Sequence, residues 1–159
     1  MKEINFGIIG TGMIAEFHAK AIAAVPGTRL VGVFSRNPEK ARAFAEKHGT
    51  VAVSSLEELL ALPGLDAVCV TTPSGSHAEV AIPALKKGIH VLCEKPLDVT
   101  REKVDAIIAA ANESGARLAA VFQMRFGEGA TKVKEAVQQG RFGRITMASC
   151  YIKWWRSQE

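Results

Sequence analysis

The sequence has few cysteines, and none of them forms a motif that binds a metal. It contains only Cys69, Cys93 and Cys150, with no CxxC pair among them. Cys69 and Cys93 lie inside apolar runs, where cysteine behaves as a small hydrophobic residue. The odd number and the spacing indicate neither a disulfide framework nor a zinc site. We therefore expect no bound metal and a reducing compartment, the cytoplasm.

Long apolar runs and long basic runs are also absent. No apolar run approaches the roughly 20 residues of a membrane-spanning helix, and the N-terminus lacks the pattern of a signal peptide. The net charge is only +4, and Lys and Arg are scattered along the chain, which is not typical of a nucleic-acid-binding arm. We therefore predict a protein that binds neither membranes nor nucleic acids, and whose mild positive charge suits an anionic cofactor.

What the sequence does contain is an alternation of short apolar runs and amphipathic stretches. Hydrophobic residues make up 48% of the chain, which is enough for a buried core. Strands are predicted at residues 4–9, 29–35, 51–53, 66–72, 89–93 and 117–122, and helices at 13–25, 38–47, 55–62, 78–87 and 100–114. Such alternation predicts a doubly wound parallel α/β sheet, in which ligands bind at the C-terminal ends of the strands.

The pattern changes after residue 122. A polar helix is predicted at residues 130–139, and residues 144–155, which carry two tryptophans, are predicted to form a long strand. That strand needs a partner strand, and only four residues follow it. We therefore predict a first domain at residues 1–122 and the start of a truncated second α/β domain at 123–159. The exposed strand is also a candidate surface for forming a homo-oligomer.

The residues GTGMIA at 10–15 form a GxGxxA motif that follows a predicted strand and opens a predicted helix. This context is the one that dinucleotide binding requires. Gly10 permits the tight turn, Gly12 allows a pyrophosphate to approach the backbone, and Ala15 lets the helix pack closely on the strand. The free N–H groups at the start of the helix then face the phosphates. A glycine-rich turn without a ligand is the competing interpretation.

The end of the second predicted strand bears on the choice between NAD and NADP. NAD-selective sites usually place Asp or Glu there to bind the ribose 2′-hydroxyl. This chain has Ser35, Arg36 and Asn37 instead, and a hydroxyl, a guanidinium and an amide suit a 2′-phosphate better. We therefore favour NADP over NAD. The competing interpretation is that Ser35 and Asn37 merely end the strand and cap the next helix.

Two further polar segments follow the fourth and fifth predicted strands. TTPSGSH at 71–77 forms a compact loop that suits the nicotinamide half of a dinucleotide, although His77 could simply begin the next helix. Glu94, Lys95 and Pro96 follow the fifth strand, beside the expected cleft. A lysine there can hydrogen-bond a substrate hydroxyl or take its proton. The alternative is an ion pair that closes the loop.

These segments supply the residues that we expect to bind the cofactor, and Lys95 is also the candidate catalytic residue. The expected cofactor-binding residues are Gly10, Thr11, Gly12, Met13, Ile14, Ser35, Arg36, Asn37, Thr71, Thr72, Pro73, His77, Glu94 and Lys95.

The motifs together resemble the Gfo/Idh/MocA family, which contains glucose–fructose oxidoreductase and inositol dehydrogenase. The matching segments are GIIGTGMIA at 7–15, TTPSGSH at 71–77, HVLCEKPLDVT at 90–100 and FQMRF at 122–126. The resemblance implies a Rossmann domain that binds NAD or NADP, followed by an α/β domain that supplies much of the substrate site. It also implies an oxidoreductase that transfers hydride to or from a carbinol carbon of a sugar, cyclitol or related compound. In that family the lysine corresponding to Lys95 contacts the substrate hydroxyl.

The same resemblance implies that part of the active site lies elsewhere. The family's second catalytic cluster, which usually contains Asp and His, would lie beyond residue 159, so we expect this chain to bind a dinucleotide but not to turn over a sugar or polyol alone. One alternative is a non-catalytic dinucleotide-binding regulatory module, against which Lys95 argues. Another is a different two-domain NAD(P)-dependent reductase, such as an amino-acid or bile-pigment reductase. The sequence predicts neither the substrate nor the oligomeric state.

Overall fold

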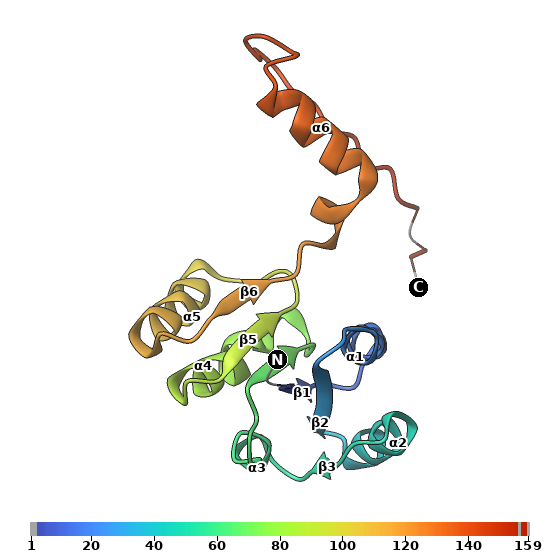
Figure 1. Ribbon diagram of the computed structural model, residues 1–159, viewed down its shortest axis with the longest axis vertical. Helices are drawn as coiled ribbons and strands as arrows, with labels where there is room; N and C mark the ends of the chain where they lie inside the picture. The colour runs from blue at the N-terminus through green and yellow to red at the C-terminus, as the bar shows by residue number, and fades with distance from the viewer. Residues whose placement is uncertain (1–2, 156, 159) are drawn as a thin grey trace. The chain divides into compact units, whose positions relative to one another are not determined.

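The computed structural model describes residues 3–155 and 157–158, which divide into two compact units, one ending at Val121 and one beginning at Phe122. In the described part of the first unit, six parallel strands form one sheet in the order β3-β2-β1-β4-β5-β6 (Figure 1). The strands are β1 (Ile4–Ile9), β2 (Thr28–Phe34), β3 (Ala52–Val53), β4 (Ala67–Val70), β5 (His90–Cys93) and β6 (Leu118–Ala120). This order is that of a doubly wound Rossmann sheet, which confirms the predicted fold class.

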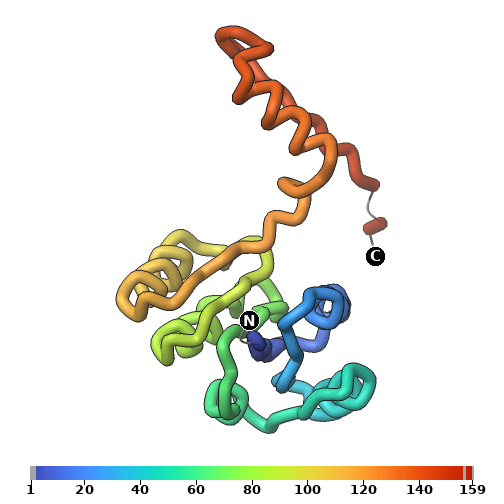
Figure 2. Tube along the Cα trace, in the orientation of Figure 1, coloured from blue at the N-terminus to red at the C-terminus, as the bar shows by residue number. Residues whose placement is uncertain are grey.

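Helices alternate with these strands along the chain, as the tube in Figure 2 shows from the blue N-terminal segment through yellow to the start of the orange segment. They are α1 (Met13–Ala24), α2 (Pro38–His48), α3 (Leu56–Leu59), α4 (His77–Lys86) and α5 (Arg101–Ser114), with a short 3₁₀ helix, η1, at Ser74–Ser76. Each link between strands therefore contains a helix that can cover a face of the sheet, which is what parallel pairing requires.

Neighbouring residues of the central strands point into two different cores. Ile8 packs with Val33 and Cys69 in a cluster that also contains residues of α1 and α2. Ile9 packs with Val68 and with residues of α3, α4 and α5 in a second cluster. Because side chains alternate along a strand, the continuous apolar runs of the sequence cover both faces of the sheet.

The buried cysteines belong to this packing. Cys69 lies in β4 and Cys93 at the end of β5, and neither side chain is exposed to solvent. Burial, together with the nearby carboxylate of Glu94, raises the pKa of each thiol to about 12. Both thiols are therefore protonated at neutral pH, and they act as small apolar side chains.

Capping residues and a glycine at the helix ends explain why several observed helix boundaries agree with those predicted from the sequence. Asn37 accepts a hydrogen bond from the backbone N–H of Lys40 (3.0 Å) at the start of α2, and Gly49 ends that helix with φ of +62°. Ser55 caps α3 by accepting from the N–H of Glu58 (3.0 Å). The carboxylate of Glu58 also accepts from the backbone N–H and the hydroxyl of Ser54, at 2.7 Å each, which ties the chain before the cap to the helix.

The second unit differs from the prediction. It contains a 3₁₀ helix, η2 (Gln123–Phe126), and one α-helix, α6 (Glu128–Gln138), among its described residues. The long strand predicted at 144–155 is wrong, because no described residue of that segment is part of a strand. A strand forms only when its backbone pairs with another strand, and the described residues after 122 provide none. Residues 156 and 159 of the predicted second domain, and 1 and 2 of the first, lie outside the described ranges.

Within the described ranges, no helix combines the length and the apolar character that crossing a lipid bilayer requires.

Candidate functional site

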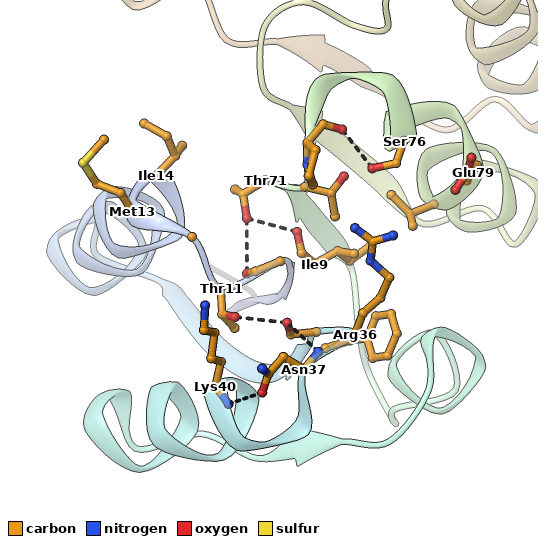
Figure 3. A pocket seen from close by; sticks show the side chains of 17 residues that line it. Ile9, Thr11, Met13, Ile14, Arg36, Asn37, Lys40, Thr71, Ser76 and Glu79 are labelled. Carbon is orange, nitrogen blue, oxygen red and sulfur yellow. Dashed lines mark hydrogen bonds between the residues drawn. The ribbon is translucent and has the colours of Figure 1, made fainter. Parts of the chain in front are cut away.

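A cavity of about 690 Å³ lies at the C-terminal ends of β1, β2 and β4 (Figure 3). It is the position at which an open parallel sheet binds its ligands. Most of the predicted cofactor-binding residues line it, and these are Gly10, Thr11, Gly12, Met13, Ile14, Ser35, Arg36, Asn37, Thr71, Thr72 and Pro73. Sequence reasoning missed Ile9, Phe34, Lys40, Ser76, Glu79 and Val80, which also line it. His77, Glu94 and Lys95 are not among the lining residues.

The turn after β1 is held tightly at Gly10. Its N–H donates to the carbonyl oxygen of Phe34 (2.8 Å), and its φ of +103° is one that residues with a Cβ rarely adopt. A Cβ at Gly10 would lie 2.8 Å from the carbonyl oxygen of Thr71. The Thr71 hydroxyl in turn donates to the carbonyl oxygen of Ile9 (3.0 Å). The turn therefore leaves no room for a side chain on the side that faces β4.

Gly12 serves a different purpose from Gly10. It is the N-cap of α1 and has an extended backbone (φ −78°, ψ −179°) that any residue can adopt. Because glycine has no side chain, no side-chain hydrogen bond caps the helix. A Cβ at Gly12 would meet no protein atom within 4 Å. The first N–H groups of a helix have no partner within the helix. The start of α1 thus faces open space in the cavity, where an anion can approach the N–H groups.

A polar turn connects the glycine turn to the end of β2. The hydroxyl of Thr11 donates to Ser35 Oγ (3.1 Å), and Ser35 Oγ also accepts from the N–H of Asn37 (3.3 Å). Ser35 and Asn37 therefore do end the strand and cap α2, as the competing interpretation proposed, and they still line the cavity. Arg36 and Lys40 line it as well, and neither forms an ion pair with a described residue.

Thr72 brings an unsatisfied polar atom to the cavity. Its hydroxyl oxygen is buried and has no hydrogen-bond partner among the described residues. A buried polar atom without a partner is costly, and most such atoms in native proteins are satisfied. The cavity therefore offers a bound polar ligand a group that the protein leaves open.

His77 has a structural role at the first position of α4. Only 1% of the residue is exposed, and its ring nitrogens lie 2.8 Å from the carbonyl oxygens of Pro96 and Thr72. Carbonyl oxygens only accept, so the ring is the donor toward these loops. The imidazole therefore ties the loop after β4 to the loop after β5, whose Lys95–Pro96 peptide bond is cis. His77 is also the first residue of α4, so it begins the helix as the alternative interpretation had it.

Asp98, which sequence reasoning missed, holds the same two loops. Its carboxylate accepts from the N–H groups of Ala78 (2.9 Å) and Val99 (2.7 Å), and Lys103 Nζ lies 3.8 Å away. Burial opposes the charge, but the two backbone hydrogen bonds and the charges of Lys103 and His77 outweigh it, so the pKa of Asp98 lies below its usual value. Asp98 thus stabilises the start of α4 as a carboxylate.

Replacing Asp98 with asparagine is expected to lower the free energy of unfolding by about 1.5–3 kcal/mol at neutral pH, because an amide cannot accept both buried N–H groups with charge assistance. Since the folded-state pKa is depressed, the contribution of Asp98 is present above the unfolded pKa of about 3.9 and is lost as pH falls through the folded value. Urea unfolding at neutral pH and in steps below pH about 4 measures both effects. Asp105→Asn, on the exposed face of α5, is the control, and equal losses for the two variants would contradict this role.

Glu94 and Lys95 do not pair with each other, unlike in the alternative interpretation of this segment as a loop-closing ion pair. Glu94 Oε1 lies 2.9 Å from His18 Nε2, and Glu94 Oε2 accepts from the backbone N–H of Lys95 (3.2 Å). The Lys95 side chain is exposed and forms no ion pair with a described residue. The ammonium is thus available to a ligand at the end of β5. His18 escaped sequence reasoning because it lies on the buried face of α1, 76 residues away from Glu94.

Comparison with known proteins agrees with this geometry. The family described as an oxidoreductase family with an NAD-binding Rossmann fold matches residues 4–122. Inositol 2-dehydrogenase of Rhizobium meliloti is 32% identical over 92% of this chain and 44% of its own length. An NADP⁺-dependent scyllo-inositol 2-dehydrogenase of Bacillus subtilis is 33% identical over 92% of this chain and 45% of its own length.

A solved structure gives the same result. The WlbA dehydrogenase of Bordetella pertussis, in complex with NADH and UDP-GlcNAcA, is 38% identical with a TM-score of 0.86, over 90% of this chain and 42% of that one. The chain therefore spans less than half the length of these relatives. The matching family, the shared sheet and the identities above 30% lead to one conclusion: this chain belongs to the Gfo/Idh/MocA oxidoreductase family and carries its NAD-binding Rossmann domain.

Proposed function

We propose that this chain is the dinucleotide-binding part of an oxidoreductase that transfers hydride to or from a carbinol carbon of a sugar, cyclitol or related compound. The observation that carries the proposal is the open start of α1 at Gly12, inside a cavity at the C-terminal ends of the strands. A pyrophosphate fits there because helix N–H groups and the positive end of the helix dipole favour an anion. Residues 123–159 would begin a second domain in the same enzyme.

The side chains around the cavity fit the rest of a dinucleotide. Ser35 and Arg36 follow β2, and Lys40 lies in the first turn of α2, next to the place where the adenosine ribose binds in this fold. The orphan hydroxyl of Thr72 follows β4, where a nicotinamide ribose or amide could satisfy it. When bound, the nicotinamide supplies the hydride donor or acceptor. Lys95 would hydrogen-bond the substrate hydroxyl and hold or take its proton.

The charges near β2 favour NADP within this proposal. Arg36 and Lys40 are two cations without ion-pair partners among the described residues, and Glu79 of α4 is the one carboxylate that the described part of the chain contributes to the cavity. An NAD-selective carboxylate at the end of β2 is replaced by Ser35. Relatives differ in this respect, since one is NADP⁺-dependent and another was solved with NADH.

Replacing Arg36 with alanine is expected to weaken NADPH binding about tenfold or more and NADH binding much less, because a charge-assisted contact to phosphate is worth about 1.5–3 kcal/mol. Fluorescence titration of the chain with each reduced cofactor measures this difference. Arg42→Ala is the matched control, because Arg42 lies on α2 but does not line the cavity. Equal losses for both cofactors would show that Arg36 does not read the 2′-phosphate, and a wild-type chain that binds neither cofactor would refute the proposed function.

The reaction itself is tested with a longer protein that contains this chain and is as long as its relatives. Sugars and cyclitols are supplied with each oxidised cofactor, and the appearance of NAD(P)H is followed. Substrate-dependent reduction of the cofactor supports the proposal, and its absence across the panel contradicts the assigned substrate class.

A further inference from the structure

Glu94 is the acidic neighbour of the proposed catalytic lysine, and both of its carboxylate oxygens are already engaged. Oε1 lies 2.9 Å from His18 Nε2, and Oε2 accepts from the backbone N–H of Lys95 at 3.2 Å. The side chains of His18 and Glu94 are only 10% and 14% exposed. No ion pair joins Lys95 to a described residue, although a carboxylate stands next to it in the sequence.

This arrangement needs an explanation, because opposite charges on adjacent residues can reach each other. A pair between Glu94 and the exposed ammonium of Lys95 would gain little, since exposed ion pairs are weak and cost side-chain freedom. His18 offers Glu94 a better partner. Its ring is fixed on the buried face of α1 beside Ala15 and Ala19, so a short hydrogen bond forms where little water competes.

We propose that His18 is a positioning residue for Lys95: by holding the carboxylate of Glu94 it prevents that carboxylate from pairing with the ammonium, which stays free for a ligand hydroxyl. That the ammonium serves a ligand hydroxyl rests on the proposed function. The competition of His18 and Lys95 for the carboxylate of Glu94 does not. His18 also lies on the helix that begins at the glycine turn. One helix thus presents its N-terminus to the cavity and, about a turn and a half later, fixes the residue before Lys95.

The test measures the reactivity of Lys95 in the chain without cofactor or substrate. Competitive acetylation with acetic anhydride, followed by mass spectrometry, gives the rate at Lys95 relative to exposed Lys87 as an internal reference. His18→Leu fills a similar space without a donor, so Glu94 is released to pair with Lys95. The relative rate at Lys95 is expected to fall about twofold to fivefold, the range that an exposed ion pair accounts for.

Two matched variants separate positioning from a general loss of structure. His18→Gln keeps an N–H donor for Glu94 and is expected to restore the wild-type rate. Combining His18→Leu with Glu94→Gln removes the competing carboxylate and is expected to restore it as well, even if α1 packs less tightly. Unchanged reactivity in folded His18→Leu, or an equally low rate in the double variant, would overturn the proposal.

Cofactor binding provides an independent readout. Because the acetylation is performed without cofactor, a chain that bound no dinucleotide would refute the proposed function and leave the reactivity result as it stands. Circular dichroism of each variant confirms that the rates are compared between folded proteins. If His18→Leu does not fold, the comparison is made with His18→Met, which also lacks a hydrogen-bond donor.

Discussion

Replacing Gly12 with valine is expected to weaken the binding of NADPH and NADH severely while leaving the fold intact. The backbone at Gly12 is extended, with φ of −78°, and a Cβ there meets no protein atom within 4 Å. The free energy of unfolding should therefore fall only by the cost of an unfavourable N-cap residue, about 0.5–2 kcal/mol. The valine methyl groups would instead occupy the space in front of the first N–H groups of α1, through which a pyrophosphate must approach.

The expected loss of affinity is large because several charge-assisted hydrogen bonds would be lost together. Each is worth about 1.5–3 kcal/mol, so losing two lowers the affinity by about a hundredfold or more. Fluorescence titration gives the affinity, and urea unfolding of the same variant gives the stability. Gly129→Val is a control in α6, where a Cβ also meets no atom within 4 Å and no cavity residue is involved. A Gly12→Val chain that binds like the wild type would remove the glycine turn from the proposed site.

Replacing Gly10 with alanine is expected to have the opposite result, a large loss of stability. The added Cβ would lie 2.8 Å from the carbonyl oxygen of Thr71, and the φ of +103° already disfavours any residue with a side chain. Neither backbone can move cheaply, because Gly10 N–H donates to Phe34 and Thr71 N–H donates to Ile9. Strain and overpacking, at about 1–3 kcal/mol each, predict a loss of roughly 2–6 kcal/mol in the free energy of unfolding.

A second glycine separates the two causes of that loss. Gly49 also has a positive φ, of +62°, but a Cβ there meets no atom within 4 Å. Gly49→Ala should therefore show only the backbone cost, about 1–2 kcal/mol. Urea unfolding of the two variants makes the comparison. If Gly10→Ala loses no more stability than Gly49→Ala, the collision with Thr71 is not a constraint on the turn.

Local sequence signals were sufficient for much of the fold. The apolar run of β1 ends at a glycine, and α2 has an asparagine cap and a glycine stop, so each boundary depends on residues next to it. The same is true of the glycine turn, whose role depends on the strand before it and the helix after it. These elements were predicted to within one or two residues.

Features that depend on distant residues could not be predicted in this way. The partners of His18 and Asp98 lie 76 and 20 residues away, and no pattern near either residue reveals them. Lys40 was overlooked because only the folded turn after β2 brings it to the cavity. The strand predicted at 144–155 failed for a related reason: hydropathy can suggest a strand, but only a partner strand can complete it.

Helix α1 both begins at the glycine turn of the cavity and carries the His18 that contacts Glu94. This double role restricts the insertions and deletions that the domain tolerates in this helix. His18 is buried together with Ala15, Ala19 and Ile22 on one face of that helix. Each residue of an α-helix turns the chain by about 100°, so a single insertion or deletion between Gly12 and His18 would rotate the imidazole away from Glu94 and the small alanines away from the sheet. Surface loops tolerate such insertions and deletions easily. Within α1, however, the number of residues between Gly12 and His18 fixes the face of the helix on which His18 lies. Among chains with this domain, the spacing from the second glycine of the turn to the histidine should stay constant even where the side chains around it differ.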